Sequence, residues 1–120
     1  MYFLRPLTAV TLAALLPAAA FATSFDGLYK PAGTDYWTCD PERIGEDRHA
    51  VAIQGDKLFG VGNTCTLTNA VPVREMNATL YDAKCAAEGA TYAYRIILMR
   101  HANGVYVIED GFASEWLNCP

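Results

Sequence analysis

Four widely separated cysteines, at positions 39, 65, 85 and 119, most strongly limit what this chain of 120 residues can fold into. A closed zinc site or a redox dithiol usually contains closely spaced pairs such as C-x-x-C, and no such pair occurs here. A nucleophilic cysteine would leave a partner thiol unpaired. We therefore expect two disulfides and no metal site, and four cysteines allow three pairings.

The stretch between Cys65 and Cys85 favours one of these pairings. Antiparallel strands over residues 65–71 and 79–85, with the two cysteines opposite each other, have one mainly apolar and one mainly polar face. A half-buried strand pair requires this division. On the apolar face the register pairs Leu67 with Ala83, Asn69 with Tyr81 and Val71 with Thr79. The preferred bridges are therefore Cys65–Cys85 and Cys39–Cys119.

The N-terminus has the features of an export signal. Arg5 precedes an apolar run over residues 7–22, which closes with the small-x-small pattern Ala-Phe-Ala. The run contains Pro17 and is shorter than the ~20 residues that a membrane-spanning helix needs. We therefore expect residues 1–22 to be removed and residues 23–120 to form one domain without membrane insertion. The expected location is periplasmic or secreted, where disulfides persist.

The charge balance narrows the choice of partner. The formal net charge is −4 and becomes −5 when Arg5 is removed with the signal. An acidic domain of this size is a poor match for nucleic acid or for an anionic membrane surface. It remains suited to a protein partner that carries positive charge.

The rest of the chain has the pattern of short strands joined by turns. Gly55-Asp56 separates the β-like runs "HAVAIQ" and "KLFGVG", as in a two-residue hairpin. Between "ATYAYRIILMR" and "VYVIED", "ANG" predicts a three-residue turn with Gly104 left-handed, which places Leu98 opposite Ile108 and Met99 opposite Val107. A helix over "AKCAAEGATYAYRIILM" is the alternative, but Gly89 and the β-branched and aromatic residues favour a strand. With "FDGLYK" and "FASEWLNC" there are about seven strands.

These strands predict an all-β fold. We expect a small antiparallel up-and-down meander, closed as a barrel or folded as a sandwich and held by two disulfides. The segment between residues 31 and 48 is expected to be a long loop that the bridge at Cys39 holds in place. Within it, Tyr36 and Trp37 are candidate binding residues if exposed, although we expect burial at one end of the fold.

The sequence offers little for catalysis. His49 and His101 are interpreted as surface histidines, and no serine lies in a G-x-S-x-G motif. Acidic residues between positions 42 and 47 lack the spacing of a calcium loop. We therefore assign no catalytic residue, no cofactor and no metal. A pair of carboxylates in a barrel mouth, as in a glycoside hydrolase, is the alternative for a catalytic function.

The spacing of several motifs resembles that of a group of small exported four-cysteine bacterial β proteins without an assigned activity. The motifs are G-x-Y near the expected start of the domain, a cysteine before a hairpin, C-x-x-E-G from Cys85 to Gly89, and a final cysteine near the C-terminus. This resemblance covers most of residues 23–120. It implies a fold and a compartment, but no reaction.

A second resemblance is to periplasmic lysozyme inhibitors of the small-barrel type. Their loop motif S-G-x-x-Y is similar to "EGATY", in which Gly89 and Tyr92 match and Glu88 stands in place of the serine. This similarity implies that Glu88, Gly89 and Tyr92 are binding residues, while a plain turn at Glu88-Gly89 is the simpler interpretation.

We expect a secreted or periplasmic, non-catalytic binding module whose partner is a protein of the cell envelope. An inhibitor of a cell-wall-degrading enzyme and a small carboxylate-dependent hydrolase are the alternatives.

Overall fold

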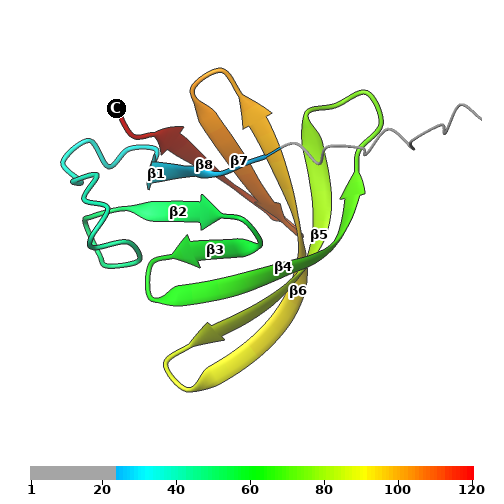
Figure 1. Cartoon of the computed structure of the whole chain (residues 1–120), viewed down its shortest axis with the longest axis horizontal. Coiled ribbons are helices and arrows are strands. Elements are labelled where there is room, and N and C mark those ends of the chain that lie inside the picture. Colours follow the sequence, from blue (N-terminus) through cyan, green and yellow to red (C-terminus); the bar gives the residue numbers. More distant parts are fainter. Residues whose placement is uncertain (1–23) are drawn as a thin grey trace, which may run out of the picture.

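The computed structural model describes residues 24–120, which form eight antiparallel strands and contain no helix (Figure 1). The segment 1–22, expected to be an export signal, lies outside the described residues. The strands are β1 (Gly27–Pro31), β2 (Val51–Gln54), β3 (Lys57–Gly60), β4 (Asn63–Pro72), β5 (Ala78–Ala87), β6 (Ala90–His101), β7 (Gly104–Glu109) and β8 (Phe112–Asn118).

Each strand pairs with the next along the chain, and β8 pairs with β1 to close a barrel. The all-β meander is therefore confirmed, with eight strands instead of about seven, and the barrel is the correct one of the two predicted architectures. The helix considered as an alternative for the segment around Gly89 does not form. That segment is the hairpin of β5 and β6.

The core lies inside the barrel because alternate side chains of each strand point inward. Tyr29 is fully buried, and its ring centroid lies 6.2 Å from that of Trp116 on the neighbouring strand. The Tyr29 hydroxyl donates a hydrogen bond to the carbonyl oxygen of Phe25, which is also buried. The other large buried side chains of the cluster are Val51, Ile53, Leu58, Leu67, Ile96, Leu98, Val105 and Val107.

The register of β4 and β5 agrees with the prediction only up to Thr68. Cys65 lies opposite Cys85 and Leu67 opposite Ala83, as expected. The register then shifts, so that Val71 is paired with Leu80 and Pro72 with Thr79, and the predicted pairs beyond Leu67 are wrong. The cause is a β-bulge in which Asn69 has a φ of 53°, a left-handed conformation that asparagine tolerates better than most residues. Its side-chain amide donates to the Asp82 carboxylate at 2.7 Å.

The turn between β6 and β7 also differs from the prediction. His101 pairs with Gly104, which leaves a two-residue turn, and Leu98 therefore lies opposite Val107. Gly104 does not have the predicted left-handed backbone; it is the first residue of β7. A Cβ at this position would collide with the carbonyl oxygen of Trp116. The close approach of β8, and not the turn, is the reason for glycine.

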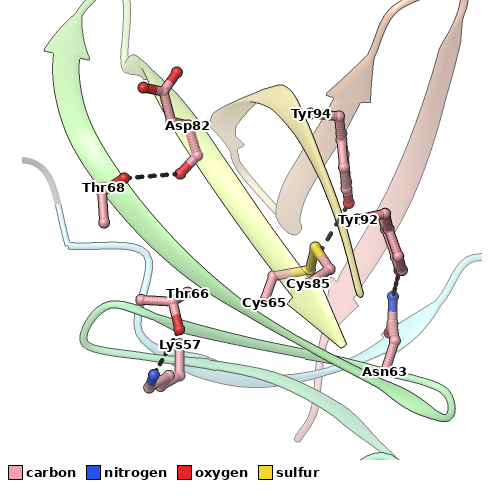
Figure 2. The surroundings of a disulfide bond; sticks show 9 residues. All are labelled: Lys57, Asn63, Cys65, Thr66, Thr68, Asp82, Cys85, Tyr92 and Tyr94. Carbon is pink, nitrogen blue, oxygen red and sulfur yellow. Dashed lines mark hydrogen bonds between the residues drawn. A yellow bond between two sulfur atoms is a disulfide. The ribbon is translucent and has the colours of Figure 1, made fainter. Parts of the chain in front are cut away.

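Both disulfides have the preferred pairing, and none of the four cysteines is free. Cys65 and Cys85 join adjacent strands, β4 and β5 (Figure 2). Cys39 joins the loop after β1 to Cys119, which follows β8. Two such bridges indicate an oxidising compartment outside the cytoplasm.

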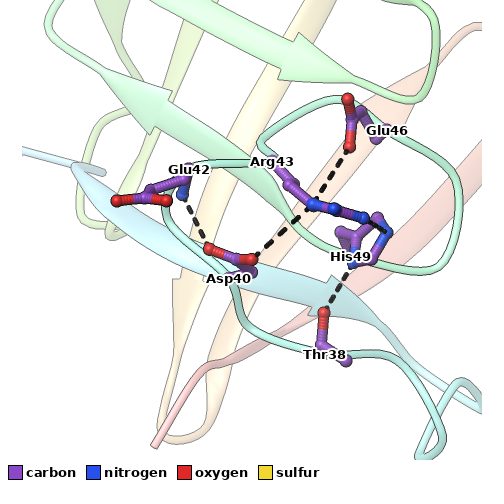
Figure 3. A network of polar contacts seen from close by, with 6 residues as sticks. All are labelled: Thr38, Asp40, Glu42, Arg43, Glu46 and His49. Carbon is purple, nitrogen blue, oxygen red and sulfur yellow. Dashed lines mark hydrogen bonds and ion pairs between the residues drawn. The ribbon is translucent and has the colours of Figure 1, made fainter.

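The predicted long loop is present between β1 and β2, and polar contacts hold its turns together (Figure 3). Nδ1 of His49 lies 2.7 Å from the Thr38 hydroxyl, and Nε2 lies 3.3 Å from the guanidinium of Arg43. The same guanidinium is 3.9 Å from the carboxylates of Asp40 and Glu46. These exposed ion pairs contribute little free energy, so the Cys39 bridge is the main constraint on the loop.

Candidate functional site

The hairpin of β5 and β6 extends beyond the end of β7. β5 and β6 pair continuously down to Ala87 and Ala90, at the turn. In contrast, the pairing of β6 with β7 begins only at Ile97, opposite Ile108. Within residues 24–120, the first half of β6 therefore has a strand neighbour on one side only. In Figure 1 this end of the hairpin, drawn in yellow, extends away from β7 and β8.

Glu88 and Gly89 form the tip of this hairpin. Both have positive φ, 43° and 79°, as the central residues of a tight two-residue turn of type I′ require. The interpretation of Glu88-Gly89 as a turn between two strands is thus confirmed. The turn also carries the Glu88 carboxylate to the exposed end of the longest hairpin of the barrel.

Two tyrosines lie side by side on the inner face of the hairpin. The rings of Tyr92 and Tyr94 are stacked, with centroids 5.8 Å apart and planes 15° from parallel. Asn63 donates a hydrogen bond of 2.9 Å to the Tyr92 hydroxyl, and the Tyr94 hydroxyl lies 3.9 Å from the sulfur of Cys65 (Figure 2). Tyr92 is 43% exposed. The pair is an aromatic shelf that extends from the disulfide to solvent.

Within this shelf, the Tyr94 hydroxyl has a strongly raised pKa. Burial, followed by repulsion from the Glu109 carboxylate, raises the pKa of Tyr94 to about 12. Glu109 is the last residue of β7, and its negative charge disfavours ionisation of the Tyr94 hydroxyl. The phenol is therefore neutral at physiological pH.

The outer face of the same hairpin is hollowed. A depression of about 650 Å³ lies over β4, β5 and β6. The side chains that line it are mainly small, because threonine and alanine occupy most of the outward-facing positions. The lining residues are Thr64, Thr66, Lys84, Cys85, Ala86, Thr91, Tyr92 and Ala93. The depression is mostly apolar, with one cation.

Two more cations lie near Lys84 on this outer face. Lys57 is opposite Thr66, which is itself opposite Lys84, and the Lys57 ammonium donates to the Thr66 hydroxyl at 2.6 Å. Arg95 lies across from Asp82 and is 3.3 Å from its carboxylate. This face is therefore locally positive on a chain whose net charge is negative.

Tyr36 and Trp37 are not part of the hairpin site. Tyr36 is 72% exposed, so its predicted burial is wrong, whereas Trp37 is partly buried. The indole Nε1 of Trp37 is buried without a hydrogen-bond partner among the described residues. Asp35, the residue before Tyr36, lines a separate hollow with Lys30 and Pro120. The two aromatic residues are therefore a second, distinct binding candidate.

The histidines and carboxylates do not form a recognisable catalytic group. Besides His49 in the loop, His101 faces Glu115, with Nε2 3.3 Å from the carboxylate, and accepts the Asn103 N–H at Nδ1. Each of the five best-defined hollows on the described surface is lined by at most one acidic side chain. Residues 24–120 also contain no group of three metal-ligating side chains. A carboxylate pair for glycoside hydrolysis is not found in these hollows.

Comparisons with protein-family models, with curated proteins and with solved structures gave no match. In the described part of the chain, no helix of a length and polarity suited to crossing a bilayer is present.

Proposed function

We propose that this chain is a periplasmic or secreted, non-catalytic module that binds a protein partner through the β5–β6 hairpin. The observation that carries the proposal is the extension of that hairpin beyond β7, with Glu88 at its exposed tip and Tyr92 on its side. Partly exposed tyrosines are frequent anchors of protein interfaces. The two disulfides and the apolar N-terminal segment support export.

The cross-strand bridge makes the hairpin suitable for binding. Cys65–Cys85 links β5 to β4 close to the point where the β7 pairing of β6 is missing. A hairpin held in this way loses little conformational entropy when a partner binds, and affinity benefits from that preorganisation.

Photo-crosslinking tests the proposal. A photoreactive phenylalanine analogue is placed at Glu88, and a matched probe is placed at Asp35, an exposed acidic residue of the loop after β1. Each processed chain is irradiated in the envelope of its producing cell. We expect one dominant protein adduct from position 88, reduced by excess unlabelled chain and missing from position 35. Adducts from position 35 alone, or identical adducts from both, would overturn the proposal.

A second candidate function, inhibition of a cell-wall-degrading enzyme, is favoured by the position of Glu88. A carboxylate at the tip of a projecting hairpin can enter the cleft of a basic enzyme, and a negative net charge assists the encounter. A purified c-type lysozyme is the probe. Inhibition that is lost in Glu88→Ala and Tyr92→Ala, but kept in Asp110→Ala on the neighbouring β7–β8 turn, supports this function. No inhibition by the parent chain excludes it for that class of lysozyme.

A further inference from the structure

We infer that the exposed edge of β6 binds an extended polypeptide segment as an added strand. The inference rests on the proposed function because it specifies how the β5–β6 hairpin would engage its partner. The ligand class is a peptide in β conformation that pairs with residues 91–95 of β6 through main-chain hydrogen bonds. Strand addition to an open sheet edge is an established mode of peptide recognition.

The direction of the main-chain groups in β6 follows from the register. The two-residue turn at Glu88-Gly89 makes Ala87 and Ala90 a hydrogen-bonded pair, so Ala90 directs its N–H and C=O toward β5. The register to β5 has no shift, and the Arg100 N–H donates to the Asn77 carbonyl at 2.9 Å. Even-numbered residues of β6 therefore face β5, and odd-numbered residues face the opposite edge.

Three residues on that opposite edge have unpaired main-chain groups. From Ile97 onward the odd-numbered residues pair with β7, but within residues 24–120 no further strand lies beside Thr91, Ala93 and Arg95. No main-chain bond from these three residues to any other described loop or turn is present. All three are exposed. An edge of this kind is a template for a further strand.

The edge also lacks the features that usually prevent such pairing. Proteins protect open edges with proline, bulges or inward-pointing charges. Residues 90–95 contain no proline, and the β5–β6 register contains no bulge. Arg95 is the single charged residue of this stretch, and its guanidinium is engaged with Asp82. The edge is therefore open to a partner strand.

The two faces of the hairpin specify the side chains of the added strand. Alternate residues of that strand would lie over the outer face, next to Ala93, where Lys84 on the adjacent strand β5 favours acidic side chains. The residues between them would lie beside Tyr92 and Tyr94, where apolar side chains are favoured. The geometry thus points to a segment in which acidic and apolar residues alternate.

A second copy of this chain is a poorer occupant. Antiparallel pairing of two β6 edges around Ala93 would place Ala90 of one copy opposite Ile96 of the other. The next residues of the first copy, including Glu88, would then approach Glu109 and Asp110 at the end of β7. Like charges would meet there, and each copy carries a net negative charge.

Amide hydrogen exchange by NMR tests the inference directly. In the free processed chain, the amides of Thr91, Ala93 and Arg95 should exchange rapidly, while those of Tyr92 and Tyr94 are protected by β5. The probe is the peptide acetyl-Val-Glu-Val-Glu-Val-Glu-Val-amide. We expect it to slow exchange at the three odd-numbered residues and to leave the even-numbered ones unchanged. The same peptide with lysine for glutamate tests the charge preference, and its alternately N-methylated form tests the main-chain bonds.

Variants separate the edge from the fold. Ala93→Pro removes an N–H that has no partner in the barrel and should weaken peptide binding about tenfold or more. Ala102→Pro, in the turn at the other end of β6, is the matched control and should bind as the parent does. Lys84→Glu should weaken binding of the acidic peptide and improve binding of the lysine peptide. Far-ultraviolet circular dichroism and the melting temperature show whether each variant is folded.

Several results would overturn the inference. They are slow exchange at Thr91, Ala93 and Arg95 in the free chain, equal binding of the N-methylated peptide, and a concentration-dependent dimer whose formation alone protects these amides. Failure of the proposed function can be distinguished from failure of strand addition. A specific crosslink from position 88 with no effect of Ala93→Pro rejects strand addition but keeps the binding module. Alternating protection without any crosslink keeps the edge site but rejects the proposed function.

Discussion

Cys65 and Cys85 lie directly opposite each other on β4 and β5, with Cα atoms 4.0 Å apart. Even-numbered residues of β5 face β4 because its odd-numbered residues face β6, so the two cysteines occupy a non-hydrogen-bonded position. Opposing side chains approach most closely at such positions. The bridge therefore fits a site where the sheet already brings two Cβ atoms together.

The two disulfides should differ in their contributions to stability. In the chain-entropy description, a loop of 20 residues contributes about 3 kcal/mol and one of 80 about 4.5 kcal/mol. We predict that Cys39→Ala/Cys119→Ala lowers the free energy of unfolding more than Cys65→Ala/Cys85→Ala. Urea denaturation of the two double variants measures the difference. The reverse order would show that the β4–β5 bridge acts on the native hairpin rather than on the unfolded chain.

The ionisation of Tyr94 should affect stability at high pH. Its pKa is about 12 in the folded chain and about 10 when unfolded, so the folded state holds the proton more tightly. The stabilisation is complete below pH 10 and is lost as the pH rises from about 10 to about 12. Spectrophotometric titration should therefore show one phenol fewer near pH 12 in Tyr94→Phe.

Glu109→Gln is the companion variant for this titration. It should lower the Tyr94 pKa without returning it to 10, because burial is the larger cause of the shift. An unchanged pKa in Glu109→Gln would contradict the contact between the end of β7 and the aromatic shelf.

Gly104→Ala should be strongly destabilising. The new Cβ would meet the main chain of Trp116, which cannot move without opening the β7–β8 pairing. We expect a loss of about 3 kcal/mol. Gly55→Ala is the control, since its Cβ meets nothing within 4 Å and only the backbone φ of 60° is unfavourable, at a cost of about 1 kcal/mol. Thermal unfolding followed by circular dichroism compares the two, and equal losses would contradict the close approach at Gly104.

Leu98 and Leu80 test the inward and outward faces of adjacent strands. Leu98 is fully buried in the barrel, whereas Leu80 lies on the outer face and is partly exposed. Leu98→Ala should cost about 3 kcal/mol because it leaves a cavity, and Leu80→Ala about 1 kcal/mol or less. Chemical denaturation measures both. A larger loss for Leu80 would mean that the outer face is covered in solution.

Glu88 occupies a backbone conformation better suited to another residue. At φ 43° in a tight hairpin turn, asparagine is preferred to glutamate. We predict that Glu88→Asn raises the free energy of unfolding by about 0.5 kcal/mol. Glu88→Gln, which removes the charge without the turn preference, should not. If both variants lose partner binding while only Glu88→Asn gains stability, the carboxylate is retained at the tip for binding and not for folding.

The disulfides and the all-β meander could be predicted from the sequence because they depend on local patterns, whereas the sequence left barrel and sandwich as alternatives. Cys65 and Leu67 fall on one face of an alternating strand, and short apparent turns follow most strands. The bulge at Asn69 could not be predicted, because asparagine has only a weak preference for positive φ. Whether Asn69 adopts that conformation depends on how β4 pairs with β5. The role of Gly104 could not be predicted from the turn between β6 and β7, because it depends on the close approach of β8.

The open edge of β6 could have been predicted from the unequal lengths of two sequence runs. The run "ATYAYRIILMR" is much longer than "VYVIED", so the two cannot pair over their full length. Pairing from the β6–β7 turn outward then leaves the residues around Ala93 without a neighbour. The exposure of Tyr36 could not be predicted from the sequence in this way, because it depends on how the bridge from Cys39 holds the long loop.

The seam between β1 and β8 has a consequence for how the chain is assembled. All other strand pairs are sequence neighbours and can form as soon as their turn is made, but this pair joins segments separated by most of the domain. Contacts of such long sequence separation form slowly. As the chain emerges with its N-terminus first, β1 would keep one free side until the final strand followed. The interval before the seam closes is therefore the period in which the nascent protein is most vulnerable to mispairing and to chaperone capture.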